Sequence, residues 1–402
     1  MSVTSINSPG APSLSAAPMV SVTAPPDGLW LRSRNWDTLF MTLSVLFVPL
    51  PYAFYLLGMR FGIAETVARN GVNLIVAFLV GGPHMYATFM RTALDEQFVK
   101  RYPALIRSSI LIPIVVVALA FLNLNLLLTI FFFWASIHVL HQVVYIVELY
   151  NHRKSSIKPL SRMIDYALVM TCLFPAAAYK ISQNDFNIGT NDLTAVIPGF
   201  FKAEWFWIAA SAIFGIALLA YVIKTALEIR DGNIHWPKTV FITITVAVAF
   251  TMPMLKNLDT AFQGLNCWHS FQYLVLTLYI VRLRKQHGDL THTSKIVDRV
   301  AGGQSPMRLY LFTVSMVLGS LFLGVVVYIL VGIVAPTWAD QQRFDTAYYT
   351  AILCFLWIHY YHDHFLFTDF EAIDRAAGRT GSPNGSAVIA STLIGANKAA
   401  SS

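Results

Sequence analysis

Long apolar segments separated by short polar loops are the feature that most constrains how this chain folds. A helix needs about 20 apolar residues to cross the hydrocarbon core of a bilayer. Ten segments approach that length, at residues 38–59, 72–92, 105–123, 126–150, 162–180, 204–225, 237–255, 263–283, 308–335 and 345–367. The third and fourth are nearly continuous, and Asn123-Leu124-Asn125 marks the expected turn between them.

Charged residues are scarce, and their placement tests the number of segments. They make up 12% of the chain, against roughly 25% in an average soluble domain. If all ten segments cross the bilayer, 22 of the 28 Lys and Arg residues lie on the side that holds both tails. Cytoplasmic loops carry the basic excess. The sequence therefore predicts an all-α polytopic bundle of about ten transmembrane helices with both termini cytoplasmic. Topology also accounts for the net charge of +7, so no nucleic-acid partner is expected.

The two ends of the chain differ in composition from the rest. Residues 1–30 are rich in Ser, Pro and Ala, and they lack the basic start and apolar core of a signal peptide. Residues 376–402 are similarly rich in Gly, Ser and Ala. We expect both tails to be disordered and residues 31–375 to form one transmembrane domain, in a multi-pass protein of the bacterial inner membrane.

Histidines gather on a subset of the predicted helices. Ionisable side chains inside a membrane segment cost free energy, usually face the bundle interior and mark functional sites. Seven of the eleven histidines lie within or at the ends of the second, fourth, eighth and tenth segments, which all cross in the same direction. They are His84, His138, His141, His269, His359, His362 and His364.

The fourth segment has a polar stripe. Steps of three or four residues place its members on one helical face, opposite Val, Leu and Ile. They are His138, His141, Tyr145, Glu148 and His152. We interpret the stripe as a functional face; the alternative is that it only hydrogen-bonds neighbouring helices.

The tenth segment places His359, His362 and Asp363 on one face. Helical bundles build metal sites from imidazoles and carboxylates on facing helices. The alternative is that the residues around His362 are simply hydrated at the inner interface.

The eighth and second segments contribute one intramembrane histidine each. His269 and Tyr273 are spaced i, i+4, and His269 is expected nearer the outer side than the other histidines unless the eighth helix begins several residues earlier. His84 follows Gly81-Gly82-Pro83, which should weaken the helix and free backbone carbonyls. Alternatively, His269 is a satisfied packing residue, Gly81-Gly82-Pro83 is a packing kink, and His84 caps a carbonyl that the kink frees.

The candidate donors indicate the type of metal. Neutral imidazoles with a few carboxylates suit iron, copper, zinc or manganese. The three cysteines are not closely paired, which argues against a thiolate metal site, and the HExxH motif of zinc proteases is absent. We therefore expect one or two non-haem irons; haem is less favoured because no second helix repeats the spacing of His138 and His152. The candidate ligands are His84, His138, His141, Glu148, His269, His359, His362 and Asp363. Tyr145 and Tyr273 are candidate catalytic residues that would hydrogen-bond an oxygen ligand or supply an electron.

Two short motifs carry a resemblance. HVLHQ at 138–142 and HYYHDH at 359–364 look like the HxxH-type boxes of histidine-rich multi-span membrane oxygenases. The chain resembles the bacterial β-carotene dioxygenases most, and alkane hydroxylases and fatty-acid desaturases more distantly, whose cytosolic HxxxH and HxxHH boxes are missing here. The resemblance implies His138, His141, His359 and His362 as iron ligands.

Two functions of different class remain. The first is a membrane-embedded non-haem iron oxidoreductase that uses dioxygen on an apolar lipid, hydrocarbon or isoprenoid dissolved in the bilayer, with an electron-donor protein as a possible partner. The alternative is a transporter of protons, metal or a small solute, in which the His/Tyr/Glu stripe is a relay, since imidazole titrates near neutral pH. The chain shows no internal repeat of the kind common in transporters. A structural subunit that anchors a partner's cofactor is a third interpretation.

Overall fold

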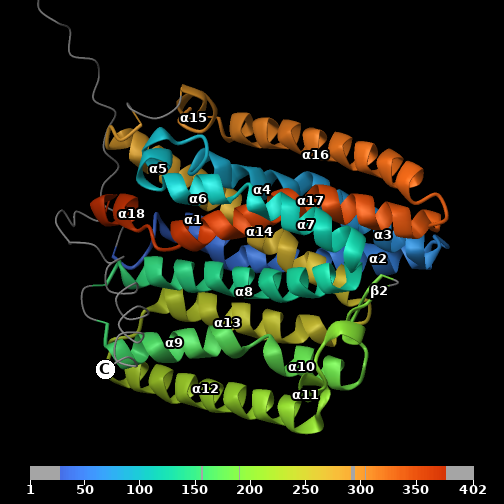
Figure 1. The fold of residues 1–402 in the computed structure, drawn as a ribbon. Coiled ribbons are helices and arrows are strands. Elements are labelled where there is room, and N and C mark those ends of the chain that lie inside the picture. Colours follow the sequence, from blue (N-terminus) through green and yellow to red (C-terminus); the bar gives the residue numbers. More distant parts are fainter. Residues whose placement is uncertain (1–27, 155–156, 190, 291–294, 304, 377–402) are drawn as a thin grey trace, which may run out of the picture.

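The computed structural model describes residues 28–154, 157–189, 191–290, 295–303 and 305–376 (Figure 1). Across these residues the protein is a bundle of helices with one short hairpin. The predicted disordered tails fall almost wholly on residues 1–27 and 377–402, which lie outside the described residues.

Each predicted segment lies in a helical stretch, and eight of these stretches, within the described residues, are long and apolar enough to span a membrane. They are Arg34–Arg60, Glu65–Met90, Pro103–Leu122, Leu124–Asn151, Pro159–Ser182, Glu204–Arg230, Trp236–Met254 and Pro306–Val334. The all-α membrane bundle is thus confirmed in outline, while the count of ten crossings and the orientation stay predictions.

The first half of the chain contains several interrupted helices. Its elements are α1 (Arg34–Trp36), the π turn η1 (Asp37–Thr42), the 3-10 turn η2 (Leu43–Phe47), α2 (Pro49–Arg60), α3 (Glu65–Val76), the π turn η3 (Ala77–Gly81), α4 (Gly82–Ala87), the 3-10 turn η4 (Thr88–Met90), α5 (Glu96–Arg101), α6 (Pro103–Ser108), α7 (Leu111–Leu122), α8 (Leu124–Asn151), α9 (Pro159–Thr171) and α10 (Phe174–Ser182).

The second half begins with the hairpin and has longer helices. Its elements are β1 (Asn187–Ile188), β2 (Asn191–Asp192), the 3-10 turn η5 (Leu193–Val196), α11 (Gly199–Lys202), α12 (Glu204–Arg230), α13 (Trp236–Thr251), the 3-10 turn η6 (Met252–Met254), α14 (Leu258–Gln286), α15 (Lys295–Val300), α16 (Pro306–Val334), α17 (Asp340–Leu366) and α18 (Glu371–Ala376). The strands pair antiparallel, with Asn187 opposite Asp192.

Two long helices, α14 and α17, are absent from the eight apolar stretches although they have 29 and 27 residues. They carry buried polar side chains, among them His269 and Tyr273 on α14 and His359 and Asp363 on α17. The site candidates are therefore among the polar residues that lower the hydropathy of these two helices.

The predicted turn between the third and fourth segments is confirmed. α7 ends at Leu122 and α8 begins at Leu124. Between them the side chain of Asn123 accepts a hydrogen bond of 3.0 Å from the backbone N–H of Leu126. Asparagine is a favoured N-cap because its oxygen satisfies a backbone donor that the first helical turn leaves unpaired.

The Gly81-Gly82-Pro83 sequence interrupts its helix, as predicted. The chain passes through the π turn η3 before α4 starts. Pro83 has no backbone N–H to continue the ladder, and π turns often accompany functional sites. Gly82 also lets α4 approach α16 closely, because a Cβ there would lie 2.5 Å from the Val317 side chain.

The helices lie side by side, with α4, α8, α14 and α17 in the interior and α12 and α16 at opposite edges (Figure 1). α1 and α18 lie at one end of the bundle, called the tail end below, and the strands lie at the other, called the hairpin end. Contacts agree with this view, since the Tyr279 hydroxyl near the end of α14 donates to the Leu31 carbonyl at 3.1 Å. An even number of membrane crossings would place α1 and α18, the first and last helices of the described residues, at the same end in this way.

Candidate metal centre

Four imidazoles from four different helices meet inside the bundle. We call His84 of α4, His138 of α8, His269 of α14 and His359 of α17 the histidine cluster. Ring centroids lie 4.6 Å apart for His84–His359, 4.8 Å for His138–His359, 4.9 Å for His138–His269 and 5.0 Å for His84–His269, so the contacts close into a ring. None of the four side chains is more than 3% exposed.

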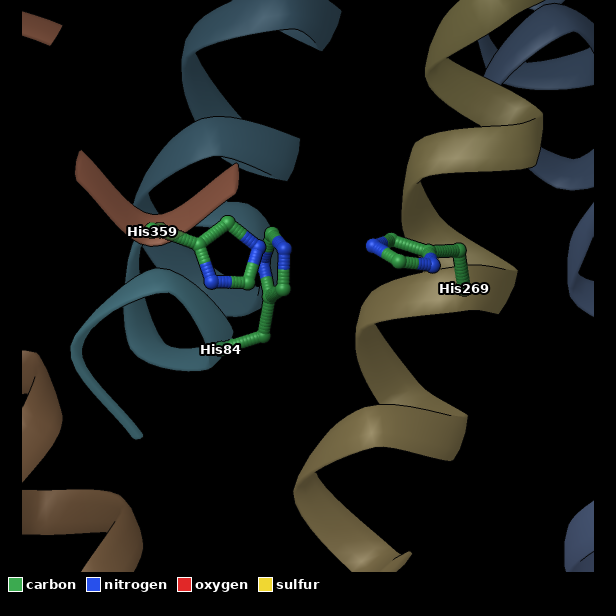
Figure 2. A group of neighbouring side chains, drawn as sticks. All are labelled: His84, His269 and His359. Atoms are coloured by element: carbon green, nitrogen blue, oxygen red, sulfur yellow. The ribbon is translucent and has the colours of Figure 1, made fainter. Parts of the chain in front are cut away.

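Nitrogen atoms of three of these rings come close enough to share one ion. One donor atom each from His84, His269 and His359 lies within 4.8 Å of the others. Figure 2 shows His269 directed from its helix toward His84 and His359. Two nitrogens on opposite sides of a metal, each bonded at 2.0–2.1 Å, are separated by about 4.2 Å. The three nitrogens are therefore close to the separation that binding of one shared ion would require.

Asp363 adds a carboxylate beside the cluster. With His138 and His359 it forms a second group of donor atoms within 4.8 Å of one another. Its Oδ2 lies 3.4 Å from Nδ1 of His359 and 3.8 Å from Nε2 of His138. Its Oδ1 accepts hydrogen bonds from Tyr273 at 2.7 Å and from Thr88 at 3.1 Å. One oxygen is thus held in place, and the other faces the imidazoles.

Six buried nitrogen and oxygen atoms that could bind a metal have no hydrogen-bond partner among the described residues. They are Nε2 of His84, Nε2 of His138, both ring nitrogens of His269, Nε2 of His359 and Oδ2 of Asp363. Each unpaired buried polar atom costs roughly 1–3 kcal/mol. Six such atoms at one place are what a metal-binding site would show without its ion. Imidazole nitrogens and a carboxylate oxygen are also suitable metal ligands.

The remaining nitrogen of His84 is fixed by the backbone. Its Nδ1 hydrogen-bonds the Gly81 carbonyl and lies 2.7 Å from the Ser270 hydroxyl. A carbonyl only accepts, so Nδ1 carries the proton and Nε2 presents its lone pair to the cluster. Metal-binding histidines have this arrangement.

Thr88 does the same for His359. Its hydroxyl oxygen lies 2.5 Å from Nδ1 of His359 and 2.8 Å from the Tyr273 oxygen. Thr88 donates its hydroxyl proton to Asp363. The Thr88 oxygen therefore accepts the proton of Nδ1 of His359, and Nε2 of His359 is left with a lone pair that could bind a metal. The sequence places Thr88 on the same helical face as His84 and Arg91, although not as a site residue, and it does not single out Ser270. The spacing of Thr88, i+4 from His84, was the available signal.

Three predicted ligands lie outside the cluster. Both ring nitrogens of His362 have partners, Thr92 at 3.0 Å and Ser109 at 2.8 Å. The ring of His141 lies against His364 and Phe367, with centroids 5.5 and 5.1 Å away.

Glu148 is the third. It accepts hydrogen bonds from Arg162, Tyr166 and Asn151 near the tail end. Ten residues of α8 separate Glu148 from His138, a rise of about 15 Å. A shared helical face therefore does not bring these residues to a shared ion.

The two predicted catalytic tyrosines have different surroundings. Tyr273 contacts Asp363 and Thr88 directly. Tyr145 lies further toward the tail end, where its hydroxyl donates to the Asp369 carbonyl at 2.9 Å and its ring stacks on Phe367. Tyr273 belongs to the candidate centre, whereas Tyr145 packs against the segment that follows α17.

A cavity of about 490 Å³ reaches the cluster from the hairpin end. Its walls include His84 and His269, and most of the other wall residues are apolar, such as Phe78, Met85 and Leu356. Small-molecule sites are typically apolar cavities of this size with a few polar groups. The candidate centre thus has both a donor set and an apolar chamber beside it.

Comparison of the chain with protein-family models gives no match, and neither curated proteins nor solved structures give a significant match.

Proposed function

We propose that the protein is a membrane-embedded non-haem iron oxidoreductase that uses dioxygen on an apolar substrate taken from the bilayer. The observation that supports this most is the convergence of unpartnered imidazole nitrogens at the end of an apolar cavity. The cytoplasmic location of the tail end, the bacterial inner membrane and a separate electron-donor protein are parts of the same proposal.

In this proposal His84, His138, His269 and His359 hold a single iron, and Asp363 lies beside it. Imidazole and carboxylate donors without thiolate favour non-haem iron. Bound iron supplies the redox chemistry that activates dioxygen toward an unreactive hydrocarbon. A haem fits less well, because the four imidazoles contact one another at 4.6–5.0 Å and a planar macrocycle would have to force them apart.

The chain's own residues have separate tasks. The Tyr273 hydroxyl, 2.7 Å from Asp363, orients that carboxylate and holds a proton next to the reacting region. The apolar walls of the cavity exclude water and align the substrate with the cluster. Thr88 fixes the tautomer of His359, which keeps its Nε2 available.

The test is the metal content of the purified full-length protein together with oxygen consumption in the presence of membrane lipid extracts. We expect about one iron per chain, lost in His84→Ala and in His138→Ala. The matched control is His362→Ala, also a buried histidine but hydrogen-bonded on both nitrogens, which should retain iron. Full iron occupancy in both cluster variants would refute the site. Proton or solute flux in liposomes without bound redox metal would favour a transporter instead.

A further inference from the structure

A second, polar cavity adjoins the apolar one. It has a volume of about 330 Å³ and lies at the hairpin end, with the strand residues Ile188 and Asn191 in its wall. Both cavities are lined by Asn73, Asp259 and Tyr349. Because they share wall residues the two cavities adjoin, with more polar side chains around the smaller one at the hairpin end and the apolar one reaching the histidine cluster.

The boundary between the two cavities contains polar groups that are incompletely satisfied. Arg69 lines the polar cavity and is paired with Asp259 at 3.6 Å, a distance too long for a hydrogen bond. Within the described residues Arg69 makes no hydrogen bond, although a guanidinium has five N–H donors. The side-chain oxygen of Asn73 is buried without a partner, while its amide nitrogen donates to Asp259 at 3.3 Å.

The charged residues of this polar layer are one guanidinium and two carboxylates, so acidic groups are in excess. The cation is Arg69, and the carboxylates are those of Asp259 and Asp345. Asp345 already accepts hydrogen bonds from Asn191 at 3.1 Å and Gln341 at 2.7 Å. An anionic head group would meet two carboxylates and one guanidinium, so the layer disfavours phosphate or carboxylate. An uncharged group that both donates and accepts hydrogen bonds fits the free Arg69 donors and the Asn73 acceptor.

Three helices give the same distance from this layer to the cluster. Asn73 precedes His84 by 11 residues, Asp259 precedes His269 by 10, and Tyr349 precedes His359 by 10. At 1.5 Å per residue each interval spans about 15 Å. A molecule with its head in the polar layer thus presents a position about 15 Å along its chain to the cluster.

We propose that the ligand of the two cavities is an amphiphile with one long apolar chain and one uncharged, hydroxylated head, held at its head by Arg69 and Asn73. The apolar chain fills the larger cavity, and the fixed interval determines which carbon lies at the histidine cluster. This assignment rests on the proposed function for its reaction, but the binding of the amphiphile does not require metal.

Binding is therefore tested first on metal-free, full-length protein in nanodiscs. The probe is radiolabelled 1-hexadecanol, with unlabelled hexadecane and hexadecanoate as competitors. We expect saturable binding of the alcohol, weaker competition by the other two, and roughly tenfold weaker binding in Arg69→Gln and in Asn73→Leu, since a hydrogen bond to a buried group contributes about that factor. Arg60→Gln is the matched control, because Arg60 is exposed near the same end and should leave binding unchanged.

Several results would overturn the assignment. Equal competition by hexadecane would show that the head is not recognised, and stronger competition by hexadecanoate would show that it is anionic. Unchanged affinity in both Arg69→Gln and Asn73→Leu would remove the polar layer as the head site.

The iron-loaded protein provides a separate arm. Products from 1-alcohols of increasing chain length should be oxidised at a constant distance from the hydroxyl. Products oxidised at a constant distance from the methyl end would contradict positioning of the substrate by its head. Binding without any oxidation would leave the amphiphile site intact and count against the oxidoreductase alone.

Discussion

The bundle contains two buried polar regions that differ in how far their groups are paired. The charge cluster at the tail end consists of Asp165, Lys224, Lys238, Glu148 and Arg162. Asp165 is 0% exposed and forms ion pairs with Lys224 and, at 2.7 Å, with Lys238, while Glu148 pairs with Arg162. In the histidine cluster, by contrast, the inward-facing donor atoms have no partner among the described residues.

This contrast distinguishes buried polar groups that stabilise the fold from buried polar groups that serve a site. A buried charge whose partner is present joins α8, α9, α12 and α13 to one another. A buried donor whose partner is absent costs stability, and proteins retain such costs where a ligand compensates for them. Both regions appear equally polar in the sequence, so pairing rather than composition distinguishes them.

The largest expected effect comes from breaking the charge cluster. Asp165→Ala leaves two buried lysines without their shared carboxylate, and removing one partner of a buried pair costs about 3–5 kcal/mol. We expect a correspondingly large loss in the free energy of unfolding, measured by denaturant titration in detergent micelles. A loss below about 1 kcal/mol, the value of a surface ion pair, would place Asp165 in a hydrated setting and weaken the contrast.

Metal should stabilise one region and not the other. A ligand at about 100 times its Kd adds about 2.7 kcal/mol to the folded state. We expect anaerobic Fe²⁺ to raise the melting temperature of the wild-type protein in a concentration-dependent manner and to have no effect on His138→Ala. The control is Lys224→Met, which lies outside the cluster and should keep the iron-dependent shift whatever its own stability. An iron-dependent rise in the melting temperature of His138→Ala would show that the stabilisation does not come from the histidine cluster.

Removing unpartnered donors should stabilise the metal-free protein. His269→Phe keeps a ring of similar shape and deletes two buried nitrogens without partners, so we expect a gain of about 1 kcal/mol in unfolding free energy, together with loss of iron. Destabilisation of the metal-free form would instead assign His269 a structural role like that of the charge cluster. The measurement is the same denaturant titration, done in the presence of a chelator.

The smallest expected effect concerns pH at the tail end. Burial lowers the pKa of His152, but hydrogen bonds and attraction from Asp374 and Glu148 outweigh this and raise it to about 9. Because the folded pKa exceeds the ordinary value of 6.5, the stabilisation is complete below pH 6.5 and is lost as the pH rises through about 9. Partial exposure of the side chain limits the effect to less than about 1 kcal/mol. Amide exchange of residues 371–376 should accelerate over this range, and His152→Gln should abolish the dependence.

The sequence predicted the helices well because hydropathy and the turn at Asn123 are local signals. From the sequence, the depth of His269 depends on where its helix begins, with an earlier start as the alternative to a position near the outer side. α14 begins at Leu258 rather than near 263, since Asp259 and other polar residues of its first turns hide the helix from a hydropathy reading. Counted from the true start, His269 lies deep enough to meet His84.

The candidate site was recoverable only in part. Periodicity identifies a face, so His138, His359 and Asp363 could be found, but it gives no depth and no partners. His362 satisfies the same periodicity and is nonetheless held by Thr92 and Ser109. The partners that fix His84 and His359, and the cavity beside them, depend on packing between helices distant in sequence.

The π turn η3 sets the rotational phase of everything that follows it on the same helix. Each residue of an α-helix advances the side-chain direction by about 100°. The π turn holds one residue more than an α-helical turn, so winding residues 77–81 as a regular α-helix with the sequence unchanged would rotate His84 and Thr88 together by about 100°, away from the histidine cluster. At this position the angular register of one short helix decides whether the bundle has a centre at all.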